Sequence, residues 1–191
     1  TPQNLPPLEV PEDNPMTQEG IDLGRKLFYE KLLSGDNTMS CATCHGQNVA
    51  FTDFGKQFSV GIDGSVGTRN AMPLFNLYLH EDFFWDGRKE TLEDLILEPV
   101  ENPIEMKESW PNAISELQSH PTYPDEFFAA FGTDTISKEL VAKAMSQFLR
   151  TIFSADTKYD KQFTQFVAGT PDEFTEQEAL GYQLFNNDMQ I

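Results

Sequence analysis

The chain has 191 residues, 39% of them hydrophobic and 23% charged, a composition that argues against disordered and fibrous proteins. This length suits one domain with a sizeable core. A formal net charge of -18 disfavours nucleic acid and anionic membranes as partners and favours cationic ones, although acidity that serves only solubility is an equal alternative. No run approaches the roughly 18 apolar residues of a membrane span.

The N-terminal part of the chain divides into an arm, a helix and a long loop. Residues 1–16, rich in Pro, Asn and acidic side chains, are expected to form an extended arm over the surface. A helix should begin at Thr17 and end near Tyr29, because apolar and small side chains between them recur at helical spacing. Residues 46–80 show no sustained period and predict a long loop, which in a compact domain is usually functional.

Beyond residue 80, cap and stop residues predict further helices. We expect these to run from Thr91 to about Pro99, from Ser109 to about Gln118, from 124 to 131 with Gly132 as the stop, from Ser137 onwards, and from Thr175 onwards. Since no alternating strand pattern occurs, the class is all-α. The expected domains are 17–174 and a second one that begins at 175–191.

One internal repeat links the two expected domains. The hexapeptide Leu-Gly-Arg-Lys-Leu-Phe at 23–28 is echoed by Leu-Gly-Tyr-Gln-Leu-Phe at 180–185. Each copy lies on a helix that a threonine is expected to cap. The match is short, so chance is an alternative explanation.

The only two cysteines occur as Cys41-Ala42-Thr43-Cys44-His45, the C-x-x-C-H signature of covalent haem attachment. Two thiols three residues apart on one helical turn add to the haem vinyl groups, and the following histidine ligates the iron. The sequence does not name the hydrogen-bond acceptor that orients His45. Haem c is normally attached outside the bacterial cytoplasm, which predicts export to the periplasm with removal of a leader before Thr1, although a trimmed sequence would also begin without Met.

Other readings of the two cysteines fit less well. A thioredoxin-like redox pair needs a βαβ context, which the sequence lacks. A zinc site could recruit His80 and His120, but their separation from the cysteines matches no common zinc spacing. A structural disulfide would leave His45 unexplained.

Around this motif the chain resembles the bacterial dihaem cytochrome c peroxidases and the related MauG-type enzymes. The resemblance rests on segments that occur in the family's order, namely 23–28, 33–41, 67–70, 83–88 and 99–106. It implies a cytochrome c-like helical domain with long loops around one covalent haem, which is the peroxidatic haem. It also implies a second haem beyond residue 191, and the repeat at 180–185 precedes the position where its motif is due.

The resemblance further implies roles for three residues. Glu105 matches the family's distal carboxylate, an acid-base group that moves a proton between the oxygens of bound hydrogen peroxide. Trp85 matches the tryptophan between the two haems, and Asn70 matches a calcium ligand at the domain boundary. Two positions depart from the family: Ile62 stands where many members have a histidine ligand, which predicts an open iron without reductive activation, and Leu95 replaces a distal glutamine.

The expected activity is the reduction of hydrogen peroxide to water, with electrons that reach the site through the second haem from a small, basic donor protein. A mono-haem electron-transfer cytochrome with Met72 as axial ligand is one alternative. MauG-type oxidation of a protein side chain is another. The sequence leaves the oligomeric state open, a homodimer included.

Overall fold

The computed structural model describes residues 5–166 and 174–188, which fall into two compact units, one of residues 8–152 and one of residues 5–7 with the described residues from 153 onwards. The larger unit contains α1 (Gln18–Phe28), α2 (Cys41–Cys44), α3 (Leu92–Glu101), α4 (Trp110–Ser119), α5 (Tyr123–Phe131) and α6 (Lys138–Leu149), with 3-10 turns η1 (Gln47–Val49) and η2 (Leu77–Leu79). The smaller unit contains α7 (Lys158–Phe166) and α8 (Glu176–Asp188).

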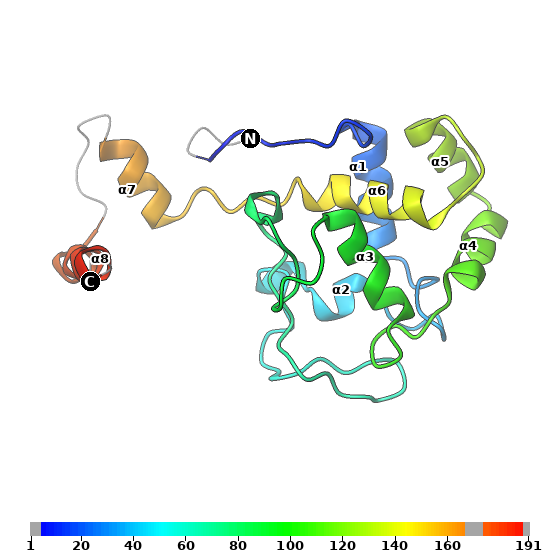
Figure 1. Ribbon diagram of the computed structural model, residues 1–191, viewed down its shortest axis with the longest axis horizontal. Helices are drawn as coiled ribbons and strands as arrows, with labels where there is room; N and C mark the ends of the chain where they lie inside the picture. The colour runs from blue at the N-terminus through cyan, green and yellow to red at the C-terminus, as the bar shows by residue number, and fades with distance from the viewer. Residues whose placement is uncertain (1–4, 167–173, 189–191) are drawn as a thin grey trace. The chain divides into compact units, whose positions relative to one another are not determined.

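The all-α prediction is confirmed. Within the described residues the β-type pairing amounts to isolated bridges, such as the one between Val60 and Val66. The segment between α2 and α3 is a long irregular loop with two 3-10 turns (Figure 1), as its composition predicts. In the described parts of the chain, no helix has the length and apolar character that a membrane crossing requires.

The capping residues act as the sequence predicts. The Thr17 hydroxyl accepts a hydrogen bond from the Gly20 amide at 3.0 Å, and the Ser137 hydroxyl accepts one from the Leu140 amide at 3.3 Å. Gly132 ends α5 with a φ of 73°, a left-handed conformation that glycine adopts without a steric penalty.

The predicted end of α3 is wrong by two residues, since the helix continues through Pro99 to Glu101. A proline has no N–H to donate to the carbonyl four residues earlier, but near the end of a helix this loss affects a single bond. The helix ends at Asn102, whose amide donates to the Glu98 carbonyl at 3.1 Å. Helix α7 was not predicted, although Thr157 and Asp160 cap its start reciprocally, with the Thr157 amide donating to Asp160 at 2.9 Å and the Asp160 amide donating to Thr157 at 3.2 Å.

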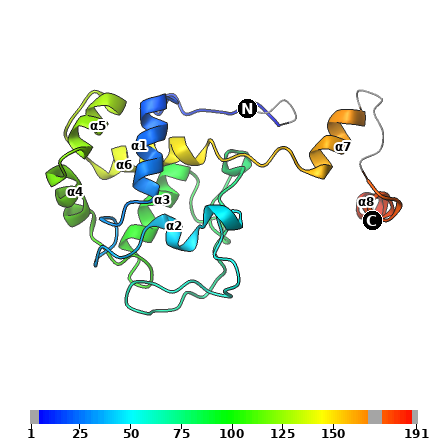
Figure 2. The same cartoon turned by 180° about the vertical axis from the view of Figure 1, so that it is seen from behind.

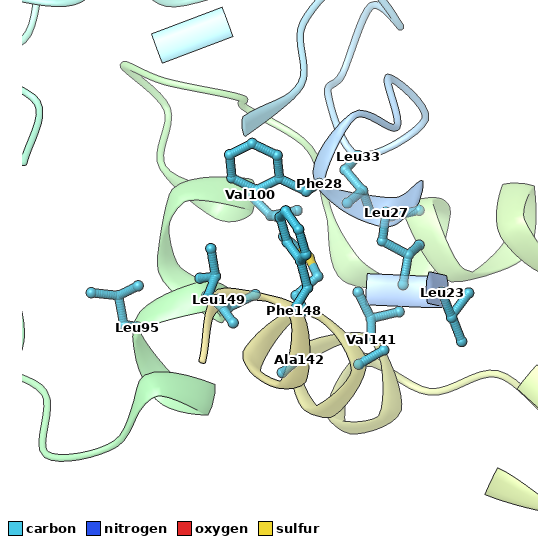
Figure 3. Close-up of a cluster of buried hydrophobic side chains, with 14 of the residues drawn as sticks. Leu23, Leu27, Phe28, Leu33, Leu95, Val100, Val141, Ala142, Phe148 and Leu149 are labelled. Atoms are coloured by element: carbon cyan, nitrogen blue, oxygen red, sulfur yellow. The ribbon is translucent and has the colours of Figure 1, made fainter. Parts of the chain in front are cut away.

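The core of the larger unit forms where α1 and α6 cross, as both views show (Figure 1, Figure 2). Gly24 permits this contact, because a Cβ built there would lie 1.9 Å from the Ala144 carbonyl oxygen. The rings of Phe28 and Phe148 pack at 5.5 Å between centroids. Side chains of α1, α3 and α6 surround this pair (Figure 3).

A buried polar network joins the N-terminal arm to this core. Asn14 is only 1% exposed, which corrects the expectation that the whole arm lies over the surface. Its side-chain Nδ2 donates to Glu93 Oε1 at 2.7 Å, and its Oδ1 accepts a hydrogen bond from Gln147 Nε2 at 2.9 Å. Arg150 forms a two-pronged ion pair with Glu93, at 2.8 and 3.0 Å. Burial without these partners would be costly, so the network fixes the end of the arm at Asn14 against α3 and α6.

The smaller unit contains the second copy of the repeat on α8. Thr175 and Glu178 cap this helix reciprocally, with the Thr175 amide donating to Glu178 at 2.7 Å and the Glu178 amide donating to Thr175 at 3.3 Å. The two copies differ in burial. Leu23, Leu27 and Phe28 are buried, whereas Leu180, Leu184 and Phe185 are 56%, 54% and 69% exposed.

Candidate functional site

A cavity of about 350 Å³ lies in the larger unit, within the size range of cofactor sites. Its wall combines α2, α3 and α6 with the loops around residues 59–72 and 84–86. The site residues singled out from the sequence all line it, namely Cys41, Cys44, His45, Asn70, Trp85 and Glu105. The fold therefore brings together residues that are up to 64 positions apart in the sequence (105 − 41).

The two cysteines lie on the single turn of α2. The Ser40 amide donates to the Thr43 hydroxyl at 3.1 Å and the His45 amide to the Cys41 carbonyl at 3.0 Å. Both cysteines are free. Burial raises the pKa of the Cys41 thiol to about 12 and also raises the pKa of Cys44, so at neutral pH both are uncharged thiols.

His45 is oriented by a backbone carbonyl. Its Nδ1 lies 2.9 Å from the Phe51 oxygen, the acceptor that the sequence could not name. Ala50 and Phe51 have φ angles of 60° and 54°, an uncommon left-handed conformation for non-glycine residues. The Phe51 amide donates a hydrogen bond to the Gly46 carbonyl at 2.8 Å, which holds this tight loop in place.

The electrostatics of His45 favour its neutral form. Burial lowers the pKa of the ring, and this effect outweighs the hydrogen bonds to the backbone of Phe51 and Met72, which raise it. With Nδ1 donating to Phe51, the neutral ring has its free electron pair on Nε2. That tautomer is the one required of a metal-ligating histidine.

Glu105 lies in the turn that follows α3. Its Oε1 accepts a hydrogen bond from Asn102 Nδ2 at 2.6 Å. Burial raises the pKa of the carboxyl more than this bond lowers it. A carboxyl with a raised pKa can both take up and release a proton closer to neutral pH, so it is suited to acid-base chemistry.

Trp85 and Asn70 contact each other at the rim of the cavity. The Trp85 indole N–H donates to the Asn70 carbonyl at 2.9 Å, and Asn70 Nδ2 donates to the Gln57 carbonyl at 2.6 Å. Trp85 is 62% exposed. Asp86 forms ion pairs with Arg69 and Arg88, each at 2.8 Å.

Arg69 and Arg88 also line the cavity, although neither was predicted as a site residue. Both lie within segments that carry the family resemblance, 67–70 and 83–88. Their position in those segments is the signal that could have identified them.

Leu95 and Ile62, the two positions that depart from the family, differ in their location relative to the cavity. Leu95, on α3, is part of the cavity wall, whereas Ile62 is not. The Ile62 amide donates to the Glu105 carbonyl at 3.1 Å, and its side chain lies near Gly35. Met72 also lines the cavity.

The zinc alternative gains no support. The His120 ring packs on Tyr123 at 4.8 Å between centroids, and neither His80 nor His120 lines the cavity. Over residues 5–166 and 174–188, no three His, Cys, Asp or Glu side chains are grouped to hold a metal ion.

The chemistry of the cavity fits haem c. Two thiols and a neutral imidazole face a pocket whose walls include Phe28, Leu74 and other apolar side chains. Ser59 Oγ, in the same wall, is buried and makes no hydrogen bond that meets the usual distance and angle limits to any described residue, although its weaker hydrogen bond with the Cys44 thiol lowers the pKa of that thiol. A buried polar atom of this kind calls for a partner, which a bound cofactor or water would provide.

Comparison with known proteins agrees with this chemistry. Residues 18–167 match the family described as di-haem cytochrome c peroxidase. The cytochrome c peroxidase Ccp of Escherichia coli K12 is 34% identical over 97% of this chain and 39% of its own length. The methylamine utilization protein MauG of Methylophilus methylotrophus is 31% identical over 96% of this chain and 56% of its own length.

Among solved structures, a MauG-like protein associated with microbial copper homeostasis superposes with a TM-score of 0.85 at 36% identity, covering 97% of this chain and 53% of that one. The chain thus spans about two fifths to just over half of the length of these relatives. With most of its length matched, the resemblance seen in the sequence is confirmed. This chain belongs to the di-haem cytochrome c peroxidase family, whose name implies haem c as the cofactor.

Proposed function

We propose that this chain is the peroxidatic haem domain of an enzyme that reduces hydrogen peroxide to water. The observation that carries the proposal is the position of Glu105, a carboxyl whose pKa burial raises, in the cavity that also contains the C-x-x-C-H residues. Relatives named cytochrome c peroxidase support the same activity.

Within this proposal, Cys41 and Cys44 hold one haem by thioether bonds and His45 ligates its iron through Nε2. The haem supplies the redox-active iron at which peroxide is reduced. The Phe51 carbonyl keeps His45 in the tautomer that leaves Nε2 free. Glu105 takes a proton from one peroxide oxygen and returns it to the other, so that the leaving oxygen departs as water and not as hydroxide.

Trp85 is the proposed electron relay toward a second haem. Its exposure at the cavity rim supports a role at a surface that another domain covers. Asn70, which contacts the Trp85 indole, is a proposed calcium ligand through its side-chain oxygen, because Nδ2 is engaged with Gln57.

We further propose that residues 175–191 begin a second cytochrome c-like domain with its own haem, after the domain at 17–174. The support is the contrast between the two repeat copies. Gly24 lies against the Ala144 carbonyl, whereas nothing described lies within 4 Å of a Cβ at Gly181. Leu180, Leu184 and Phe185 of α8 are exposed, as expected for a helix whose packing partner lies in further chain.

Electrons would come from a small, basic donor protein, consistent with the charge of -18 on this chain. The covalent haem supports a periplasmic location after removal of a leader. Neither nucleic acid nor a membrane is a proposed partner, and a homodimer is compatible with the proposal.

The Glu105→Gln variant tests the proposal. It should retain haem and fold and lose about 10²-fold to 10⁴-fold in the rate of peroxide cleavage, the usual contribution of general acid-base catalysis. The matched control is Glu101→Gln, an exposed glutamate at the end of α3, which should leave the rate unchanged. An unchanged rate in Glu105→Gln would remove this carboxyl from the mechanism.

A second candidate function is MauG-type oxidation of a protein side chain, which the relatives named MauG favour. The same haem and the same Glu105 would serve it. The full-length protein should then oxidise a protein substrate in preference to a reduced cytochrome. Comparing the two rates in one preparation separates the functions.

A third candidate, an electron-transfer cytochrome, draws on the position of Met72 in the cavity wall. A methionine sulfur on the iron would give a low-spin ferric spectrum. The peroxidase proposal expects a high-spin spectrum, because its iron has an open position.

A further inference from the structure

We propose that Asn102 is a positioning residue that holds Glu105 by Oε1 and thereby assigns the transferable proton to Oε2. The inference rests on the proposed function, in which Glu105 moves the proton, and it names the residue and the carboxylate atom that make this movement specific.

Asn102 organises the whole turn that carries Glu105. Its backbone N–H ends α3 by donating to the Glu98 carbonyl at 3.1 Å. Its backbone carbonyl accepts from the backbone amides of Glu105 and Lys107, both at 3.0 Å. Its side-chain oxygen accepts from the Ile104 amide at 3.2 Å. Such an Asx turn is a common use of asparagine. The backbone on either side of Glu105 is therefore fixed by one residue.

The same side chain then holds the carboxylate. Asn102 Nδ2 donates to Glu105 Oε1 at 2.6 Å, a short hydrogen bond. An amide nitrogen only donates, so Oε1 must remain an acceptor in both charge states of Glu105. When Glu105 is protonated, the proton therefore resides on Oε2.

The backbone of Glu105 is also held from the opposite side by the loop at 59–67. A Cβ at Gly61 would lie 2.3 Å from the Ile104 oxygen and 2.8 Å from the Glu105 oxygen. Asp63 pairs with Lys107 at 2.9 Å across this contact. With the backbone clamped, the orientation of the carboxylate depends on χ angles, and the hydrogen bond from Asn102 restricts them.

The charge balance around Glu105 defines what loss of this bond would do. Burial and Glu98 raise the pKa of Glu105, while Asn102 and Arg88 lower it. The charge of Glu105 in turn raises the pKa of the Cys41 and Cys44 thiols. Since Asn102 stabilises the ionised form, its removal should raise the pKa, and the variant should need a higher pH to deprotonate Glu105.

The test variant is Asn102→Asp in the haem-loaded protein. Aspartate keeps an acceptor for the Ile104 amide, and so keeps the turn, but places a second carboxylate where the donor was. The acid limb of the kcat/KM profile for peroxide should move up by about one pH unit or more, which is a tenfold loss on that limb. Activity should recover at higher pH.

The matched control is Asn112→Asp. Asn112 Nδ2 donates to Glu108 Oε2 at 3.0 Å, and neither residue lines the cavity. The same chemical change there should leave the pH profile in place. Asn102→Ala, which loses the donor without adding charge, is a second variant and should give a smaller shift in the same direction.

Infrared spectroscopy supplies a readout independent of activity. With ¹³C-carboxyl glutamate, the acid band that Glu105→Gln abolishes is the band of Glu105. This band should titrate at higher pH in both Asn102 variants. Asn102→Asp in the Glu105→Gln background should cause little further loss of rate, because the two residues act as a unit.

Two outcomes would overturn the inference. One is an equal loss of activity at every pH with an unshifted infrared titration, which would indicate a purely structural role for Asn102. The other is a double variant, Asn102→Asp with Glu105→Gln, whose loss of rate is the full combination of the two single losses. Failure of the proposed function looks different, since Glu105→Gln itself would then keep its peroxide activity, whatever the Asn102 variants do.

Discussion

The close contact at Gly24 predicts that a single methyl group there destabilises the larger unit. In Gly24→Ala the new Cβ would lie 1.9 Å from the Ala144 oxygen and 2.5 Å from its carbonyl carbon. Both are backbone atoms that cannot rotate away. Helices α1 and α6 must therefore separate, and the packing between the rings of Phe28 and Phe148 must loosen.

Two opposing effects set the magnitude. Alanine is favoured over glycine within a helix by about 1 kcal/mol. Overpacking a core costs about 1 to 3 kcal/mol, occasionally more, and a clash with backbone belongs at the upper end. The net expectation is a loss of about 2 kcal/mol in the free energy of unfolding, which lowers the Tm by about 4 to 8 °C in a chain of this size.

Urea denaturation followed by circular dichroism, together with scanning calorimetry, measures this change. The repeat provides the matched control, because Gly181→Ala makes the same substitution at the same motif position on α8, where nothing described lies within 4 Å. That variant should be neutral or stabilised by up to about 1 kcal/mol. If Gly24→Ala were as stable as the wild type, or if both variants shifted alike, the argument from close packing would be refuted.

Two further predictions concern the cofactor and the buried network. The wild-type chain should retain one haem through acid-acetone extraction, whereas Cys41→Ala with Cys44→Ala should lose it, and an intact mass equal to that of the apoprotein in the wild type would disprove the attachment. Burial raises the pKa of Glu93, but hydrogen bonds from Arg150 and Asn14 lower it on balance. The stability that this carboxylate contributes is therefore fully present above pH 4.5, its ordinary value, and is lost as the pH falls through its lowered native pKa. Glu93→Gln should cost about 3 kcal/mol at pH 7, because it leaves Arg150 unpaired in the interior, and should flatten the acid unfolding curve; an unchanged slope below pH 4.5 would argue against this role.

Much of the secondary structure could be predicted because its signals are local. A cap such as Thr17 or Ser137 bonds an amide three residues away, so a short window of sequence contains both partners. Pro99 shows the limit of such reasoning. A proline predicts a stop, yet the helix ends where the Asn102 turn captures the chain, and that turn also depends on contacts with the loop at 59–67.

The haem motif is equally local, since Cys41, Cys44 and His45 lie within residues 41–45, on the single turn of α2 and the residue that caps it. Glu105 and Trp85 were found through resemblance to a family and not through any pattern in their own segments. The sequence alone gives no reason why Glu105, among 31 acidic residues, should have a raised pKa. That property arises from burial against residues distant in the chain.

The sequence by itself therefore predicted most of the helices, the all-α class and a motif for haem attachment, each of which depends on groups within a few residues of one another. The tertiary structure alone decided that the Phe51 carbonyl orients His45, that Asn102 holds Glu105 and that Asn14 is buried against Glu93 and Gln147. The physical reason is that hydrogen-bond geometry and desolvation depend on which atoms meet in space. Those contacts follow from how α1, α3 and α6 pack, and the close approach of α1 to α6 at Gly24 sets that arrangement.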